Sequence, residues 1–152
     1  MAVKAKKKAP AAATAAPGAD DLAILNPDRD AKIAGRAITA REYGFIEGLA
    51  LEPAIKPFVD DLYALMEGGR VVELDEITVL LGKHEKLIVD LMVQSYGVEE
   101  DWIRSLNDSD GREVMFLWWA VCQPFFTKRV IDRLRSRMAG KRLLAGATST
   151  PS

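Results

Sequence analysis

The segment "MFLWWAVCQPFF", residues 115–126, decides how the rest of the chain must fold, because no charged side chain interrupts it. Charged residues flank it on both sides, so the apolar run is shorter than the ~20 residues that a membrane-spanning helix needs. A helix that is apolar all round is either enclosed in the protein or partly covered by a partner. The segment therefore predicts a helix with one side in the core and the other side holding a partner or a second copy of the chain.

The two sides of this helix follow from its geometry. At about 100° per residue, Trp118 shares one side with Leu117 and Val121, whereas Phe116 and Trp119 lie on the other. We expect Trp118 to face the core and Trp119 to be more accessible. The predicted partner-binding residues on this helix and the next are Phe116, Trp119, Phe125, Phe126, Val130 and Leu134.

Pro124 is expected to kink or end the aromatic helix, because proline cannot donate the helical hydrogen bond. A final helix is predicted beyond it, since apolar residues follow one another at steps of four. These residues are Phe126, Val130, Leu134 and Met138. The other faces of this helix carry arginine and lysine, so the sequence predicts an amphipathic basic helix at the end of the domain.

The composition predicts one soluble globular domain. Of the 152 residues, 49% are hydrophobic and 28% are charged, which is typical of globular proteins. Residues 1–20 are rich in Ala, Lys and Pro without periodicity, which favours a disordered tail. We expect the domain at residues 21–140 and a flexible C-terminal tail at 141–152. The basic N-terminus lacks the apolar segment of a secretory signal, which favours a cytoplasmic protein.

The expected fold class is mostly α with a small N-terminal β-hairpin, an α+β arrangement built as a compact bundle of short helices. In "AKIAGRAITARE", residues 31–42, a turn at Gly35-Arg36 would set Ile33 opposite Ile38. "LAIL" at 22–25 could add a third strand, after a turn through "NPDRD".

Helical spacing begins near Tyr43 and continues to the C-terminal end of the domain. One helix is expected to have Pro53 in its first turn and a bend or restart at Pro57, and to end at Gly68-Gly69. A second apolar stripe, with a break near Gly82, is expected to end at Gly97. A short acidic helix, "EEDWIRSL", follows, and "NDSD" at 107–110 supplies cap residues for the aromatic helix.

The residue inventory argues against an enzyme. The single cysteine, Cys122, excludes an internal disulfide and stands among aromatic residues, where a free cysteine usually acts as a small hydrophobe. The single histidine, His84, is interpreted as a surface residue, because no catalytic partner adjoins it. "DSDGRE" at 108–113 fails as a calcium loop, because leucines would occupy its first and last ligand positions. We expect no catalytic residue, no metal and no cofactor.

The charge is unevenly distributed along the chain. Residues 42–113 contain seventeen acids and six bases, whereas residues 128–142 contain seven bases and one acid. The basic ends could contact phosphates, but the acidic body would repel a polyanion. This distribution argues against nucleic-acid binding and favours a basic helix docked on an acidic body.

The order of these features resembles the tail assembly chaperones of long-tailed bacteriophages. The resemblance covers roughly Lys32 to Met138 and is carried by "AKIAGRAITAREYGF", "WIRSL" and the aromatic helix ending in "QPFF". Many members of that family have Asn shortly before the two phenylalanines, where this chain has Gln123. The resemblance implies a fold of short helices with acidic surfaces.

The resemblance also implies a function. Such chaperones bind the tape measure protein in the host cytoplasm, keep it soluble while tail tube subunits polymerise around it, and are absent from the mature virion. Tail tube subunits and a second copy of the chain are further candidate partners. The alternative is a small nucleic-acid-binding or structural virion protein that uses its basic ends.

Overall fold

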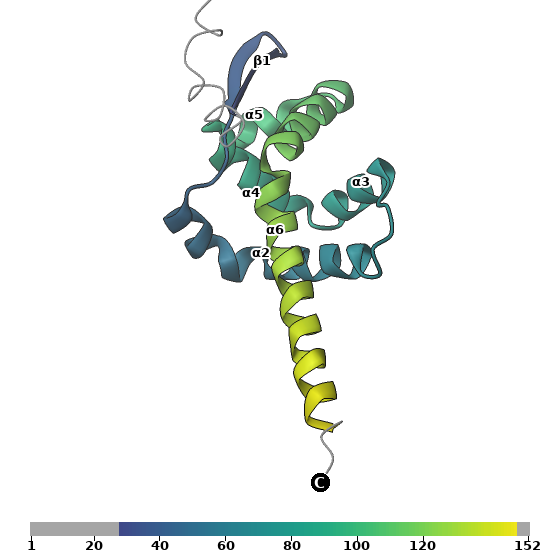
Figure 1. Ribbon diagram of the computed structural model, residues 1–152. Coiled ribbons are helices and arrows are strands. Elements are labelled where there is room, and N and C mark those ends of the chain that lie inside the picture. The colour runs from purple at the N-terminus through teal and green to yellow at the C-terminus, as the bar shows by residue number, and fades with distance from the viewer. Residues whose placement is uncertain (1–27, 149–152) are drawn as a thin grey trace, which may run out of the picture.

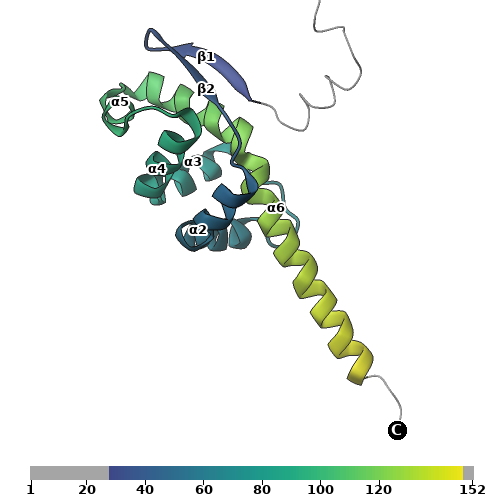
Figure 2. The ribbon, with the colours of Figure 1, turned by 90° about the vertical axis from the view of Figure 1, so that its left-hand side faces the viewer.

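The computed structural model describes residues 28–148, in which an antiparallel hairpin precedes five helices (Figures 1 and 2). The elements are β1 (Arg29–Ile33), β2 (Arg36–Ala40), α2 (Phe45–Met66), α3 (Leu74–Lys83), α4 (Glu85–Tyr96), α5 (Glu100–Ser105) and α6 (Asp108–Thr148). The expected fold class, mostly α with an N-terminal hairpin, is confirmed. The predicted N-terminal tail, the candidate strand at 22–25 and residues 149–152 lie outside the described residues.

The hairpin turn lies one residue earlier than the sequence predicted. Ala34 and Gly35 form it, with φ of 53° and 76°, so Ile33 pairs with Arg36 and Ile38 pairs with Ala31. A two-residue turn with both central residues at positive φ matches the twist of the flanking strands, which explains this choice. Because side chains alternate along a strand, Ile33 and Ile38 still share one face, and both are buried there.

The long helix α6 is the centre of the fold and packs against β1, β2, α2 and α4. The helix is 41 residues long and continues past Pro124. Of the two expected effects of this proline, a kink or the end of the helix, the second is therefore wrong. Figure 1 shows instead that the first turns of α6 lie at an angle to the long remainder. Proline has no N–H to bond the preceding turn, so one helical hydrogen bond is missing at Pro124 while the helix continues.

The expected flexible tail at 141–152 also requires correction. Residues up to Thr148 continue α6, and Figures 1 and 2 show this end projecting away from the body of the protein. The segment "AGKRLLAGAT" contains Ala, Leu, Lys and Arg, which propagate a helix that has already been nucleated upstream. Composition near a chain end is therefore a poor guide to where this helix ends.

Helix α2 crosses α6 and is longer than expected (Figure 1). It begins at Phe45 rather than near Pro53, because Glu47 caps it by accepting a 3.1 Å hydrogen bond from the Gly44 N–H. Pro53 and Pro57 therefore both lie inside one continuous helix. Its buried face presents Ile55, Phe58, Val59 and Leu62 to the core.

The remaining helices begin and end close to the glycines and capping residues from which the sequence predicted their boundaries. α2 ends before Gly68 and Gly69, both at positive φ, and Gly97 ends α4 in the left-handed conformation. His84 separates α3 from α4, close to the expected break at Gly82. Asn107 caps α6, since its Oδ1 accepts a 2.8 Å bond from the Asp110 N–H.

Ion pairs along the α2–α6 crossing extend this packing beyond the apolar core. Three arginines of α6, four residues apart, each contact an acid of α2 at 2.6–2.8 Å. The pairs are Arg129–Glu52, Arg133–Asp60 and Arg137–Glu67. This side of α6 is the basic helix docked on an acidic body that the charge distribution favoured.

The aromatic side chains of α6 form the centre of the core. Trp118 is fully buried and donates a 2.9 Å hydrogen bond from Nε1 to the Tyr43 hydroxyl. Trp119 is only 6% exposed, stacked on Phe126 and edge-on to Phe58, so the expectation that it is accessible is wrong. The reason is tertiary, because α2 covers the side of α6 that the helical projection left open.

We expect both Trp118→Ala and Trp119→Ala to destabilise the protein by about 3–5 kcal/mol, since each removes a large buried aromatic side chain. Chemical denaturation followed by far-UV circular dichroism measures this. Leu143→Ala, at a side chain that is 76% exposed, is the control and should change little. A Trp119→Ala variant as stable as the wild type would contradict the burial described above.

Candidate binding groove

An apolar groove lies between the end of α2, the start of α3 and the middle of α6. It encloses about 520 Å³. Its lining is Leu62, Met66, Gly69, Arg70, Val72, Leu74, Ile77, Trp119, Gln123, Thr127 and Leu134. Mostly apolar walls with a few polar groups at the rim are typical of sites that bind a side chain or a peptide.

The groove continues onto an exposed row of apolar side chains on α6. Leu134 is half-buried at the edge of the groove, whereas Ile131 is 39% exposed and Met138 is 56% exposed. We call these three residues the α6 stripe. They are spaced by three and four residues, so they share one side of the helix. The stripe extends the groove along the part of α6 that projects from the body (Figure 2).

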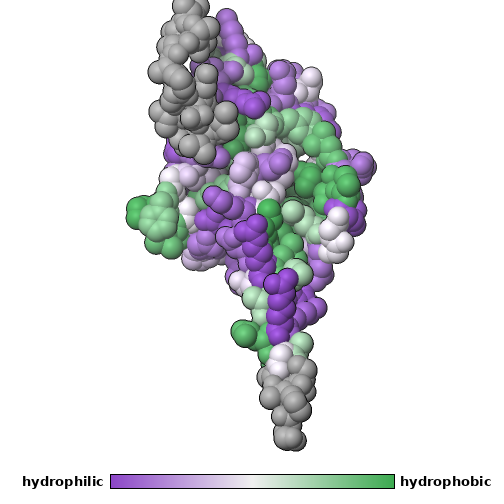
Figure 3. Space-filling model, in the orientation of Figure 1, coloured by the Kyte–Doolittle hydropathy of each residue, from purple (hydrophilic) through white to green (hydrophobic). Residues whose placement is uncertain are grey.

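Figure 3 shows apolar side chains, in green, over α3 and along α6 on the face that it displays. A separate apolar cluster lies at the start of α2, on the left of the same view. Phe45, Ile46 and Leu49 are the exposed large hydrophobic residues of that helix start, at 79%, 70% and 58%. The cluster is distant from the groove in the view of Figure 3, with the body of the protein between them.

The six predicted partner-binding residues do not lie on one surface of the structure. Trp119 and Leu134 line the groove. Phe126 and Val130 have no exposed surface, so the expectation that they are available to a partner is wrong in this structure. Phe125 is half-buried against the Tyr43 ring and beneath the Arg129 guanidinium. Phe116 is half-buried beside Arg112, away from the groove.

Helix geometry explains why a row at steps of four could not mark one surface. Each such step exceeds one turn of 3.6 residues by about 40°. The row from Phe126 to Met138 therefore rotates out of the core: Phe126 and Val130 are enclosed, Leu134 is half-buried and Met138 is exposed. Spacing alone could not tell which residue of the row marks the edge of the core.

Sequence reasoning missed the other wall of the groove. Leu62, Met66 and Ile77 belong to the apolar faces of α2 and α3, and Val72 and Leu74 lie at the connection between these helices. The available signal was the apolar "RVVEL" after Gly68-Gly69, an unusual composition for a loop. Its place beside α6 depends on how α2 and α3 pack, which periodicity does not reveal.

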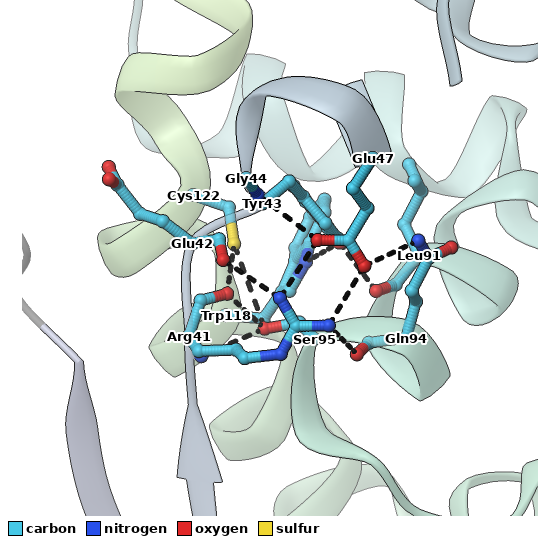
Figure 4. Close-up of polar contacts among 10 residues, drawn as sticks. All are labelled: Arg41, Glu42, Tyr43, Gly44, Glu47, Leu91, Gln94, Ser95, Trp118 and Cys122. Atoms are coloured by element: carbon cyan, nitrogen blue, oxygen red, sulfur yellow. Dashed lines mark hydrogen bonds and ion pairs between the residues drawn. The ribbon is translucent and has the colours of Figure 1, made fainter. Parts of the chain in front are cut away.

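A partly buried polar network joins the link between β2 and α2 to α4 and α6 (Figure 4). The Arg41 guanidinium contacts both carboxylate oxygens of Glu47, at 2.9 and 2.8 Å. It also donates to the backbone carbonyls of Glu42 and Gln94. The Gln94 amide donates a 2.7 Å hydrogen bond to the same Glu47 carboxylate. This arrangement holds the hairpin connection against α4.

The Arg41 guanidinium, helped by the Gln94 amide and the Gly44 N–H, holds the pKa of Glu47 at about 2, below its ordinary 4.5. The carboxylate is therefore charged at every physiological pH. All its partners stabilise that charge in the folded state, so the network is a structural element of the domain.

Cys122 and Tyr43 also contribute polar groups to this network, deeper in the core. The Cys122 thiol donates to the Arg41 carbonyl oxygen at 3.4 Å, and the Tyr43 hydroxyl donates to the Leu91 carbonyl oxygen at 2.5 Å. Burial raises the pKa of Cys122 to about 12. The thiolate, which is the reactive form, is therefore absent near neutral pH. This environment agrees with the interpretation of Cys122 as a small core residue.

His84 is less exposed than the sequence indicated. Its side chain is 14% exposed, its Nε2 lies 2.7 Å from the Asp61 carboxylate, and the Phe58 ring meets it edge-on. An ionised carboxylate only accepts hydrogen bonds, so Nε2 carries the proton. Lys83 contacts the same carboxylate at 3.0 Å. The His84–Asp61 contact ties the junction between α3 and α4 to α2.

Two further properties concern residues 28–148 alone. No three His, Cys, Asp or Glu side chains in this range are grouped as metal ligands. Within the same range, no helix is both long enough and apolar enough to cross a membrane.

Comparison with known protein families shows which family the chain belongs to. A family of unknown function, DUF6631, matches residues 21–152. The chain belongs to DUF6631. The DUF6631 match excludes residues 1–20, where the composition changes, and includes the whole of α6. No curated protein and no solved structure is detectably similar to this DUF6631 chain.

The Glu47 network predicts a specific dependence of stability on pH. The folded pKa of Glu47, about 2, lies below the ordinary 4.5. The stabilisation is therefore fully present above pH 4.5 and disappears as the pH falls toward about 2. We expect Glu47→Gln to be about 1–3 kcal/mol less stable than wild type at pH 7, with the difference shrinking through this acid range.

Urea denaturation at a series of pH values measures the difference between the two proteins. Glu113→Gln, at an exposed position on α6, is the matched control and should follow the wild-type profile. A constant difference between Glu47→Gln and wild type from neutral to acid pH would show that the Arg41–Glu47 contact does not depend on the carboxylate charge.

Proposed function

We propose that this DUF6631 chain binds a helical protein partner in the groove between α2, α3 and α6, and that it acts as a phage tail assembly chaperone. The observation that carries the proposal is the continuity of the groove with the α6 stripe. Together they form an elongated apolar surface, which the cluster at the start of α2 does not share. An amphipathic helix binds such a surface with its own apolar side.

The finer part of the proposal rests on the resemblance to tail assembly chaperones. A chaperone that holds a very long helical protein needs an accessible apolar surface on a highly charged frame, which keeps the complex soluble. The proposed partner is therefore the tape measure protein, bound in the host cytoplasm before tail tube subunits assemble around it, and the chain is proposed to be absent from the mature virion.

The polar groups support a binding protein over an enzyme. Cys122 is protonated in the core and Glu47 is occupied by Arg41. His84 contacts Asp61, at a junction of helices rather than in the groove. Among the described residues, the groove contains Arg70 as its single ionisable side chain. General acid–base or nucleophilic chemistry requires a titratable pair beside the bound substrate.

The alternative, nucleic-acid binding through the basic ends, has less support. Arg129, Arg133 and Arg137 pair with acids of α2 and its C-terminal cap, which leaves Lys128, Arg135 and Arg142 as the exposed bases beside the stripe. Phosphate binding would require bases that are free to replace counterions. A protein partner with an apolar side would contact the α6 stripe as well as the exposed bases beside it. A nucleic acid would contact only the bases, so the presence of the stripe favours a protein.

We expect Ile131→Asp combined with Met138→Asp to abolish co-purification with the tape measure protein, because two carboxylates would be buried unpaired in the interface. Co-expression of the tagged chain with the tape measure protein, followed by affinity capture, measures this. Both side chains are exposed, so the variant should fold, and a circular dichroism melt checks it.

Leu143→Asp combined with Leu144→Asp is the matched control. These leucines are 76% and 70% exposed on the same projecting helix, but lie outside the stripe. The control should retain capture. The proposed function is wrong if the wild-type chain does not capture the tape measure protein, and the proposed surface is wrong if the control and the stripe variant behave alike.

A further inference from the structure

The projecting part of α6 carries two separate rows of basic residues. The first row, Arg129, Arg133 and Arg137, is paired with acids of α2. The second row is Lys128, Arg135 and Arg142, which are exposed and lie outside the ion pairs of the first row, although the charge of Lys128 acts on Glu42. We call this second row the free basic row. The first row shows that α6 already packs against α2 through basic side chains on one of its sides.

The free basic row has the spacing of a coiled-coil flank. Its residues follow one another at steps of seven, and a seven-residue step returns to nearly the same side of a helix. Ile131 and Met138 are also seven apart, with Leu134 between them. In a coiled coil, apolar residues at this spacing form the seam, and the charged positions beside the seam pair with the opposing helix.

Each residue of the free basic row directly follows a position on the seam side. Lys128 follows Thr127, which lines the groove, and Arg135 follows Leu134. Arg142 follows Lys141, one more seven-residue step along. The helix geometry therefore places the bases beside the apolar stripe between the groove and Met138, and Arg142 continues the same row beyond it.

We infer that the stripe and the free basic row pair with a helix whose apolar seam is flanked by acidic residues at seven-residue spacing. This inference rests on the proposed function and specifies the chemistry of its partner. Complementary charges beside the seam select the partner and its orientation more than they add affinity. The groove holds the part of that helix that runs past Trp119.

A second copy of the same helix face is a poor occupant. Beyond Val121, the single acid of α6 is Asp132, which is one residue from Ile131 and therefore about 100° away from it around the helix. Two copies paired along their stripes would bring bases against bases, and like charges across a seam are unfavourable. A nucleic acid is also a poor occupant, because phosphates would leave Ile131 and Met138 exposed.

The test uses the full chain and two synthetic helical peptides of about three heptads. Both peptides carry the same Leu and Ile seam, and one has Glu at the flanking positions where the other has Lys. At about 150 mM salt, the wild-type chain should bind the Glu-flanked peptide roughly tenfold or more tightly than the Lys-flanked one. Calorimetric titration measures both affinities.

The decisive variant reverses the free basic row: Lys128→Glu, Arg135→Glu and Arg142→Glu together. We expect it to reverse the preference and bind the Lys-flanked peptide more tightly. The matched control is Arg29→Glu, Lys32→Glu and Lys86→Glu, which changes the net charge equally at exposed residues on the hairpin and α4. The control should retain the wild-type preference, and thermal melts check the fold of both variants.

Several outcomes would overturn the inference. Equal binding of the two peptides by the wild type would do so, as would a control variant that reverses the preference like the decisive one. Self-association of the wild type that the decisive variant abolishes, measured by sedimentation, would identify a second copy as the occupant. Submicromolar binding of duplex DNA or RNA that the same variant abolishes would identify a nucleic acid.

The result is separable from the proposed function. If the wild-type chain captures the tape measure protein and the decisive variant captures it equally well, the function stands and the inferred partner chemistry is wrong. If the wild type selects the Glu-flanked peptide but does not capture the tape measure protein, the inferred chemistry stands and the assignment to tail assembly is wrong.

Discussion

The enclosure of the aromatic side chains of α6 by α2 is the contact on which the rest of the structure depends. A helix segment with Trp118, Trp119 and Phe126 on several sides must be covered on each of them to remove that surface from water. The hairpin connection and α4 cover Trp118, whereas Phe58 of α2 covers Trp119 and Phe126. Because α2 crosses α6 to do this, its C-terminal end and the start of α3 are set beside α6, and the groove arises there.

The polar groups of the protein reinforce the same arrangement. The partly buried network around Arg41, Glu47 and Tyr43 holds the hairpin connection on α4 and α6 (Figure 4). The α2–α6 ion pairs continue the helix crossing beyond the last buried side chain. Exposed ion pairs contribute little to stability individually. These three lie on the side of α6 that its buried aromatic residues already turn toward α2. On the neighbouring side of α6, Leu134 still meets α2 in the groove, whereas Ile131, Met138 and the free basic row are exposed.

The candidate binding surface is thus the side of α6 that no other helix or strand of residues 28–148 covers completely. From Asp108 to about Val130, α2, α4 and the hairpin cover most of the helix. From there to Arg137 only the side toward α2 stays in contact, and the later residues extend past the body. A helix that is both anchored in a core and projecting from it presents its exposed side without flexible loops. Such a preorganised surface loses less conformational entropy when a partner helix binds.

Much of this protein follows from the sequence alone. Glycines at 68, 69 and 97 and the cap at Asn107 predicted where helices end or begin, because these residues act through local backbone geometry. Local rules also indicated the hairpin and the buried face shared by Ile33 and Ile38, although they placed the turn one residue too late. The tertiary structure alone decided that Trp119, Phe126 and Val130 are core, that α6 continues past Pro124 to Thr148, and that a groove forms beside it. Helical periodicity reports which residues share a side, but only the packing of distant helices determines which side is covered.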